Sequence, residues 1–286
     1  MNTIWQLAHS RSLRLGPQAV IMGILNVTPD SFSDGGLHAS FDAAVAQAKA
    51  MLAEGAAIID IGGESTKPNA EPVTALEEQR RVLPIIEALA VMPDVLISID
   101  TYREDTARLA VNAGAHIVND VWGLQREPGI AAVAAEAGAG LCIMHTGRGR
   151  ELLADRIEDQ HVFLRRSLEI AAKAGIRDEC IVLDPGFGFA KEETIDNVEL
   201  MVRFRELKDL GYPLMAGTSR KRFLGNITGR SAPERDVATA ASSAILRLSG
   251  ADLFRVHNVA FNRDALALAD AMLAAKRAPG KPSARG

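Results

Sequence analysis

Short runs of apolar residues alternate with longer amphipathic stretches along almost the whole chain. Eight of the apolar runs are typical of strands, at residues 20–26, 57–63, 95–100, 116–120, 141–145, 181–186, 213–219 and 253–258. Helical periodicity follows them, for example over residues 44–55, 75–90, 103–114 and 237–250, and several of these stretches end in glycine, which commonly ends a helix. The strand-like runs are apolar throughout, which is typical of a parallel sheet that is buried on both faces.

These eight strand–helix units predict a single (β/α)8 TIM barrel. The units follow one another without a linker, and single barrels of this kind often contain about 250 residues. An open, doubly wound sheet is the alternative, although it rarely needs eight units that are so evenly spaced. We therefore expect an N-terminal extension at residues 1–19, the barrel at residues 20–276 and a disordered tail at residues 277–286.

Each predicted strand ends in polar or charged residues. They are Asn26, Asp60, Asp100, Asn119, His145, Asp184, Ser219 with Lys221, and Arg255 with His257. One polar residue at a strand end is as often a cap or a turn former as a ligand, but one at every strand end is harder to explain in that way. Because the carboxyl ends of the strands carry the active site in this fold, these residues are the functional candidates.

The loop after the first predicted strand adds weight to Asn26. The run VIMGILN ends in this amide and continues into TPDSFSDGG, which is about twice as long as the usual two to six residues of a strand-to-helix connection. Long loops inside a compact domain are usually functional or disordered. Asn26 is therefore a first candidate for a functional strand end.

Composition and charge exclude several classes of protein. The 286 residues are 48% hydrophobic and carry a formal net charge of −4, which argues against a general binder of nucleic acid or of anionic membranes. Cys142 and Cys180 have no zinc or redox spacing, so we expect buried, reduced thiols. No apolar run has the length of a signal peptide core or a membrane span, so the sequence predicts a cytoplasmic protein.

Cationic side chains are nevertheless frequent in the loops at the predicted barrel mouth. They are Lys67, Arg148, Arg150, Lys221, Arg222 and Arg255, joined by His257. On an acidic protein they predict an anionic substrate. The chain has no Walker loop, dinucleotide fingerprint, HExxH zinc motif or Ser-His-Asp order. The glycines of DPGFGFAK instead allow the backbone to approach a flat ligand, with Phe187 or Phe189 as a stacking surface.

Asp100, Asn119 and Asp184 are expected to point into a nearly closed, apolar barrel mouth. A carboxylate there needs a partner with several donors, because an unpaired buried charge is costly. A planar heterocycle with an N–C–NH₂ edge would pair with a carboxylate in two places, as arginine does, and Lys221 could donate to the acceptor atoms of that ring. The alternative is an internal ion pair of Asp with Lys or Arg that holds the top of the barrel together.

Seven motifs resemble one enzyme family. GILNVTPDSFSDGG, DIGGESTKPNAEPV, SIDTYR, GAHIVNDV, DPGFGFAK, TSRKRF and FRVHN occur in the order found in the bacterial dihydropteroate synthases, over nearly the whole chain. The resemblance implies a pterin-binding TIM barrel that joins 6-hydroxymethyl-7,8-dihydropterin diphosphate to p-aminobenzoate. The products are 7,8-dihydropteroate and diphosphate, the cofactor is Mg²⁺, and the family suggests a homodimer.

The resemblance also implies a role for each matching residue. Asp100, Asn119 and Asp184 hold the pterin ring, with Lys221 on its acceptor side and Met144 and Phe189 lining the pocket. Asn26 is the Mg²⁺ ligand beside the diphosphate, which Arg255 and His257 clamp. Thr66 and Lys67 belong to a second loop that closes over p-aminobenzoate, and the loop around Arg222 receives the carboxylate of that substrate.

The chain departs from the family pattern at several positions. Lys67 replaces an arginine, Arg222 replaces a serine, Asn258 replaces an aspartate, and HTGRGR lacks the usual Met-Gln after His145. Three rival functions remain open: a corrinoid methyltransferase of the same barrel family, a catalytically silent pterin-binding paralogue, and a Schiff-base aldolase that uses Lys221. The first would not need the lid, SRK and RVH motifs, and intact site residues argue against the second.

Overall fold

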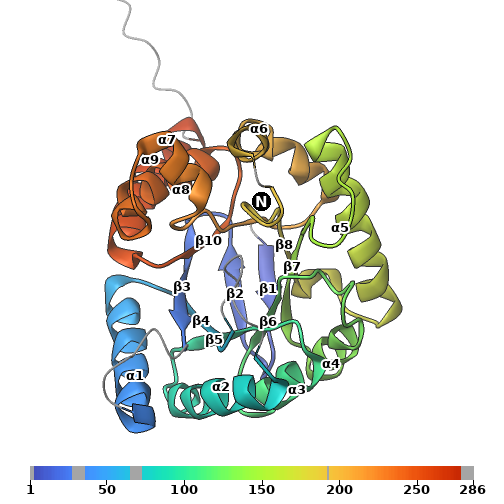
Figure 1. The fold of residues 1–286 in the computed structure, drawn as a ribbon, viewed down its shortest axis with the longest axis vertical. Coiled ribbons are helices and arrows are strands. Elements are labelled where there is room, and N and C mark those ends of the chain that lie inside the picture. The colour runs from blue at the N-terminus through green and yellow to red at the C-terminus, as the bar shows by residue number, and fades with distance from the viewer. Residues whose placement is uncertain (1–2, 28–35, 65–72, 192, 278–286) are drawn as a thin grey trace, which may run out of the picture.

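The computed structural model describes residues 3–27, 36–64, 73–191 and 193–277 (Figure 1). Its centre is an eight-stranded sheet in the order β8-β7-β6-β5-β4-β3-β10-β9, and the neighbouring strands are parallel. The strands are β3 (Val20–Asn26), β4 (Ile58–Gly62), β5 (Leu96–Asp100), β6 (Ile117–Asp120), β7 (Gly140–Met144), β8 (Ile181–Asp184), β9 (Met215–Ala216) and β10 (Leu253–Val256). A parallel bridge between Leu183 and Leu214 joins β8 to β9, so the sheet closes and the predicted barrel is confirmed.

Helices surround the ring of strands (Figure 1). They are α1 (Gly36–Glu54), α2 (Ala75–Ala90), α3 (Glu104–Asn112), α4 (Gly129–Ala137), α5 (Arg156–Lys173), α6 (Thr194–Val202), α7 (Arg222–Thr228), α8 (Asp236–Leu248) and α9 (Val259–Arg277), with short 3-10 helices η2 (Asp178–Cys180), η3 (Phe204–Leu210) and η4 (Ala232–Arg235). Helix α2 has the predicted bounds because Thr74 accepts a hydrogen bond from Glu77 N at its start and apolar side chains recur on one face. No helix in the described ranges combines the length and the apolar character needed to cross a bilayer.

A hairpin that the periodicity did not predict precedes the barrel. Strands β1 (Thr3–Gln6) and β2 (Ser12–Leu15) pair antiparallel. Trp5 and Leu15 are buried against the lower interior of the barrel, and Trp5 Nε1 donates to the Cys180 carbonyl at 2.8 Å. The hairpin therefore closes the end of the barrel at which the strands begin, where an open apolar interior would otherwise meet water.

The barrel interior is apolar at its lower end and polar at its upper end. Inward side chains recur every second residue along a strand, so Ile58 is followed by Asp60, and Leu96 by Ser98 and Asp100. The lower layer consists of Val20, Met22, Ile58, Leu96, Ile117, Cys142, Val182, Met215 and Leu253, all buried in one cluster. The polar residues two or four positions later are thereby presented at the carboxyl ends of the strands. Cys142 and Cys180 are both buried and not joined to each other, as predicted.

The seventh strand is much shorter than predicted. The sequence indicated a strand over residues 213–219, but β9 contains only Met215 and Ala216. Pro213 has no N–H to donate to a neighbouring strand, which limits the start of β9. Gly217, directly after β9, has no side chain, and a Cβ at this position would lie 3.5 Å from Asp184 Oδ2. The early end of β9 thus leaves space beside a candidate site residue.

Candidate active site

Arg255 is the centre of an ion-pair group inside the upper barrel. Its Nε donates to Asp60 Oδ2 at 2.6 Å and its Nη2 donates to Asp100 Oδ2 at 2.5 Å. Asn119 Nδ2 donates to the same oxygen of Asp60 at 3.2 Å. Burial raises the pKa of Asp100 to about 7, although Arg255 acts in the opposite direction. The internal ion pair considered from the sequence therefore exists, but it involves Asp60 and Asp100 and not Asp184.

Asp184 is a buried carboxylate with no direct ionic partner among the described residues. Its Oδ1 accepts a hydrogen bond from the backbone N–H of Gly186 at 2.7 Å, which fixes the turn after β8. Burial raises the pKa of Asp184, while Gly186, Lys221 and Arg255 lower it. Its second oxygen, Oδ2, lies beside Gly217. A ligand that presents two N–H groups would satisfy this oxygen and the negative charge together.

Lys221 and Phe189 form the next part of the site. The Lys221 ammonium lies 4.0 Å from the centre of the Phe189 ring, and burial lowers the pKa of Lys221 to about 8. Gly188 has a φ of +76°, and a Cβ there would lie 3.2 Å from Lys221 Cδ, so glycine permits this close packing. Phe187 belongs instead to the outer core, where it stacks on Phe204. Phe189 is therefore the phenylalanine at the mouth, in an apolar cluster with Tyr102, Val121, Met144 and Trp122.

His257 is neutral and oriented by Ser219. The Ser219 hydroxyl oxygen accepts a hydrogen bond from His257 N at 3.0 Å and lies 2.8 Å from Nδ1. Burial lowers the pKa of His257 to about 3, helped by Arg220, Arg255 and Lys221. When the hydroxyl donates to Nδ1, the proton of the neutral ring lies on Nε2. This geometry presents an uncharged N–H donor at the strand end.

The loop after β9 is held in a strained conformation. Arg220 has a φ of +56°, which is unusual for a residue with a side chain. Its guanidinium makes two hydrogen bonds to Asp236, at 2.7 and 2.9 Å, and Asn258 Nδ2 donates to the same carboxylate at 3.1 Å. Arg222 begins α7 and is exposed. The strain is compensated by ionic contacts that turn Lys221 inward.

Asn26 lies at the end of β3, close to Asp100. A Cβ on Gly62 would be 3.9 Å from Asn26 Oδ1 and 3.6 Å from Asp100 Oδ2, so the two oxygens lie on either side of this glycine. The described ranges contain no group of three or more acidic, His or Cys side chains that could bind a metal. One amide oxygen nevertheless suits Mg²⁺, which keeps several waters and is commonly bound through substrate phosphates. Thr66 and Lys67 lie outside the described residues.

The structure defines contacts for two residues that the sequence named only as general candidates. Asp60 was noted at a strand end, but only the structure shows that it orients both Arg255 and Asn119. The sequence signal for this role of Asp60 was a charged residue in the middle of the apolar run of residues 57–63. Arg148 lies 4.9 Å from the centre of the Phe189 ring and 5.9 Å from that of Trp122, so it extends the cationic and aromatic surface of the mouth.

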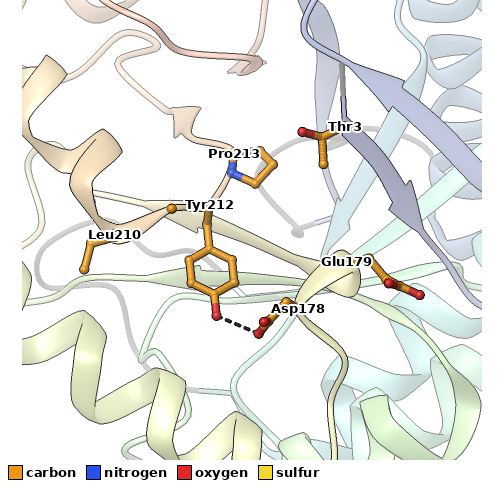
Figure 2. A pocket seen from close by; sticks show the side chains of 7 residues that line it. Thr3, Asp178, Glu179, Leu210, Tyr212 and Pro213 are labelled. Atoms are coloured by element: carbon orange, nitrogen blue, oxygen red, sulfur yellow. Dashed lines mark hydrogen bonds between the residues drawn. The ribbon is translucent and has the colours of Figure 1, made fainter. Parts of the chain in front are cut away.

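A shallow hollow at the opposite end of the barrel contains none of the candidate residues (Figure 2). It has a volume of about 310 Å³ and is lined by Thr3, Asp178, Glu179, Leu210, Gly211, Tyr212 and Pro213. The Tyr212 hydroxyl donates to Asp178 Oδ1 at 2.7 Å, as Figure 2 shows. Since barrel enzymes place their chemistry at the other end, we assign this hollow no catalytic function.

Comparison with known proteins finds similarity over most of the chain. The family model described as pterin binding enzyme matches residues 22–257. The dihydropteroate synthase of Bacillus subtilis is 44% identical over 94% of each chain. The structure of a Clostridium difficile dihydropteroate synthase with pteroic acid covers 90% of this chain and 98% of its own, with 44% identity and a TM-score of 0.87. A Xanthomonas albilineans dihydropteroate synthase with 4-aminobenzoic acid covers 97% and 100%, with 41% identity and a TM-score of 0.89.

Proposed function

The chain belongs to the dihydropteroate synthases of the pterin-binding enzyme family, and from this premise we propose how its residues carry out the reaction. The enzyme condenses 6-hydroxymethyl-7,8-dihydropterin diphosphate with p-aminobenzoate and releases diphosphate. We assign it to the transferases, because the pterin-methyl group passes from a diphosphate oxygen to an aromatic amine. The observation that best supports the residue assignments is the buried carboxylate of Asp184, which forms no ion pair within the described residues, although the charge of Lys221 acts on it.

The pterin ring is proposed to lie between Asp184 and the Arg255 group. Asp184 accepts two N–H groups from the amino edge of the ring, and Lys221 donates to its acceptor atoms. Asp100 and Asn119 contact the remaining polar edge, already oriented by Arg255 and Asp60. Met144 and Phe189 line the pocket and exclude water from the ring. The roles follow from the charge and the hydrogen-bonding capacity of each side chain.

The leaving diphosphate is proposed to lie between Asn26, Arg255 and His257. Two guanidinium nitrogens of Arg255 donate to carboxylates, and Nη1, which has no hydrogen-bond acceptor among the described residues, is the proposed donor to the diphosphate. His257 adds the neutral Nε2–H donor that Ser219 sets. Asn26 would hold Mg²⁺, which supplies a positive charge that neutralises the departing oxygens. Such preorganised donors stabilise the charge that develops as the carbon–oxygen bond breaks.

The second substrate is proposed to approach over Phe189, where the mouth is cationic. Its aniline nitrogen is already nucleophilic, so the site needs no dedicated general base. Its carboxylate would be received near the start of α7, where Arg222 is exposed, with Thr66 and Lys67 approaching from the second loop. This arrangement would place the amine toward the pterin and the carboxylate toward solvent.

We further propose that the enzyme is a cytoplasmic homodimer that pairs through α8 and α9. These two helices pack on each other and expose Val237, Ile245, Phe261, Leu268 and Met272, with exposed fractions of 45% to 74%. Val237 and Ile245 lie eight residues apart, on one stripe of α8. Burying this apolar surface against a second copy would stabilise the pair. Sedimentation of the purified chain tests this point, because a monomer at micromolar concentration contradicts it.

Diphosphate release in the presence of both substrates tests the proposed reaction. We expect release only when pterin diphosphate, p-aminobenzoate and Mg²⁺ are all present, with 7,8-dihydropteroate formed in equal amount. Release that is independent of p-aminobenzoate, or absent with both substrates, would overturn the assignment. Borohydride trapping of a carbonyl substrate on Lys221 would instead indicate an aldolase.

A further inference from the structure

Four ionisable side chains lie together behind the pterin site, on the side of the helices. They are His145, Arg150, Asp159 and Lys191, from the end of β7, the loop that follows it, helix α5 and the loop after β8. His145, Asp159 and Lys191 are 0%, 1% and 3% exposed. None of them has a role in the proposed reaction, although burying so many charges is costly.

The hydrogen bonds of this group define the state of each member. The Lys191 ammonium lies 3.1 Å from His145 Nδ1, which must accept because an ammonium can only donate. His145 Nε2 lies 2.7 Å from Asp159 Oδ2 and also 2.7 Å from Arg150 Nη2. With Nδ1 as the acceptor, the ring proton is on Nε2 and is donated to Asp159, and the approach of Arg150 is then a close contact and not a hydrogen bond. Burial lowers the pKa of His145 to about 3, with Lys191 acting in the same direction. Arg150 neutralises Asp159 through two hydrogen bonds, at 2.8 and 2.6 Å.

The same group is attached to the segment that carries Asp184 and Phe189. Lys191 Nζ donates to the Gly186 carbonyl at 2.9 Å, and this oxygen also accepts from Phe189 N at 3.2 Å. The backbone N–H of His145 donates to the Asp184 carbonyl at 2.8 Å. Gly186 has a φ of +64°, and a Cβ there would lie 2.0 Å from the His145 carbonyl oxygen, so only glycine fits at this position of the turn.

Lys191 is also a cation beside Asp184 at pH values below its pKa, which burial lowers to about 7. Within the described part of the chain, no carboxylate lies within 4.0 Å of its ammonium, so its charge is not cancelled by direct contact. The charged groups that face Lys191 are Asp184, Asp159, Arg150 and Lys221. The cations that face Asp184 are Lys221, Arg255 and Lys191. Lys221 and Arg255 are ligand-binding residues in the proposed function, and Lys191 approaches from behind the turn.

We propose that Lys191 is a positioning residue for the pterin site. Its buried ammonium holds the turn of residues 184–189 through the Gly186 carbonyl and favours the ionised form of Asp184 from the side opposite the ligand. Neutral His145 keeps Lys191 in place without cancelling its charge, and Arg150 with Asp159 keeps His145 in place. This inference rests on the proposed function, in which ionised Asp184 pairs with the pterin.

The test compares Lys191→Met with Lys191→Arg and Asn197→Ala. Asn197 holds the same loop without a charge, because its Oδ1 accepts from Gly188 N at 2.7 Å and its Nδ2 donates to the Lys191 carbonyl at 2.9 Å. For each variant, the affinity for 6-hydroxymethyl-7,8-dihydropterin is measured by calorimetry as the pH is lowered. In Lys191→Met we expect about a tenfold loss of affinity at neutral pH. The acid limb, which is the part of the affinity–pH curve where binding is lost as Asp184 is protonated, should move to higher pH by at least about half a unit.

The two control variants separate charge from structure. The acid limb should keep its parental position in Lys191→Arg, which retains the charge, and in Asn197→Ala, which only loosens the loop. An unchanged acid limb in Lys191→Met, or an equal shift in Asn197→Ala, would overturn the proposal. If Lys191→Met does not fold by circular dichroism, Lys191→Gln is measured under the same criteria. Failure of the proposed function would show separately, as absence of diphosphate release by the parent enzyme.

Discussion

Replacing Asp184 with Asn tests the pterin site with little disturbance of the fold. In the parent protein, Asp184 Oδ1 accepts from Gly186 N at 2.7 Å, and Asn keeps an oxygen that can do the same. The change therefore acts on Oδ2, which faces the space beside Gly217. This oxygen becomes an NH₂ group, which would meet the N–H groups of the pterin donor to donor.

The size of the effect follows from the burial of this carboxylate. Asp184 is 4% exposed, and disrupting one side of a buried charged pair costs about 3–5 kcal/mol. Because the bond to Gly186 survives, we take the lower end, about 3 kcal/mol. A loss of 1.4 kcal/mol is tenfold in affinity, so the dissociation constant for the pterin diphosphate should rise by about two orders of magnitude.

Isothermal titration calorimetry of the pterin diphosphate with Mg²⁺ measures this change directly. Asp178→Asn is the matched control, because the same chemical change is made at the opposite end of the barrel (Figure 2). The control should bind as the parent does. A dissociation constant within about threefold of the parental value for Asp184→Asn would refute the assignment, since that corresponds to less than about 0.7 kcal/mol.

Three further changes test other parts of the site. Asp60→Ala should lower the free energy of unfolding by about 3 kcal/mol, measured in urea, because Arg255 and Asn119 lose a buried acceptor; a change below about 1 kcal/mol contradicts this. Burial raises the pKa of Asp100 to about 7, so the folded protein binds the extra proton and loses stability as the pH rises from about 4 to about 7. Asp100→Asn should remove this loss, so the free energy of unfolding of the variant minus that of the parent should rise by about 2–4 kcal/mol from about pH 4 to about pH 7. A difference that does not change with pH would contradict the raised pKa of Asp100. Arg222→Ser should raise the KM for p-aminobenzoate about tenfold in steady-state kinetics, with the pterin KM unchanged, whereas a change under about threefold marks Arg222 as a surface charge.

The sequence by itself determined the barrel and predicted the end at which its chemistry lies. The run of residues 20–26 became β3 without change, and the stretch of residues 75–90 became α2. These features are local, because burial of both faces makes a strand apolar throughout, and burial of one face gives a helix a period of about 3.6. Polar residues at the strand ends are local signals as well, which is why Asp100, Asn119, Asp184 and Arg255 could be named before the fold was known.

Only the tertiary structure decided which of these residues pair with one another. Asp60 and Arg255 are 195 residues apart, and closure of the barrel brings them within 2.6 Å. Periodicity could not separate Phe187 from Phe189, since both lie at alternate positions of a glycine-rich turn; packing placed the first on Phe204 and the second under Lys221. Whether a charge is free for a ligand depends on distances between strands that are remote in the chain. The Asp100 carboxylate is taken by Arg255 and that of Asp184 is not, because the side chain of Arg255 extends toward β4 and β5 and ends there.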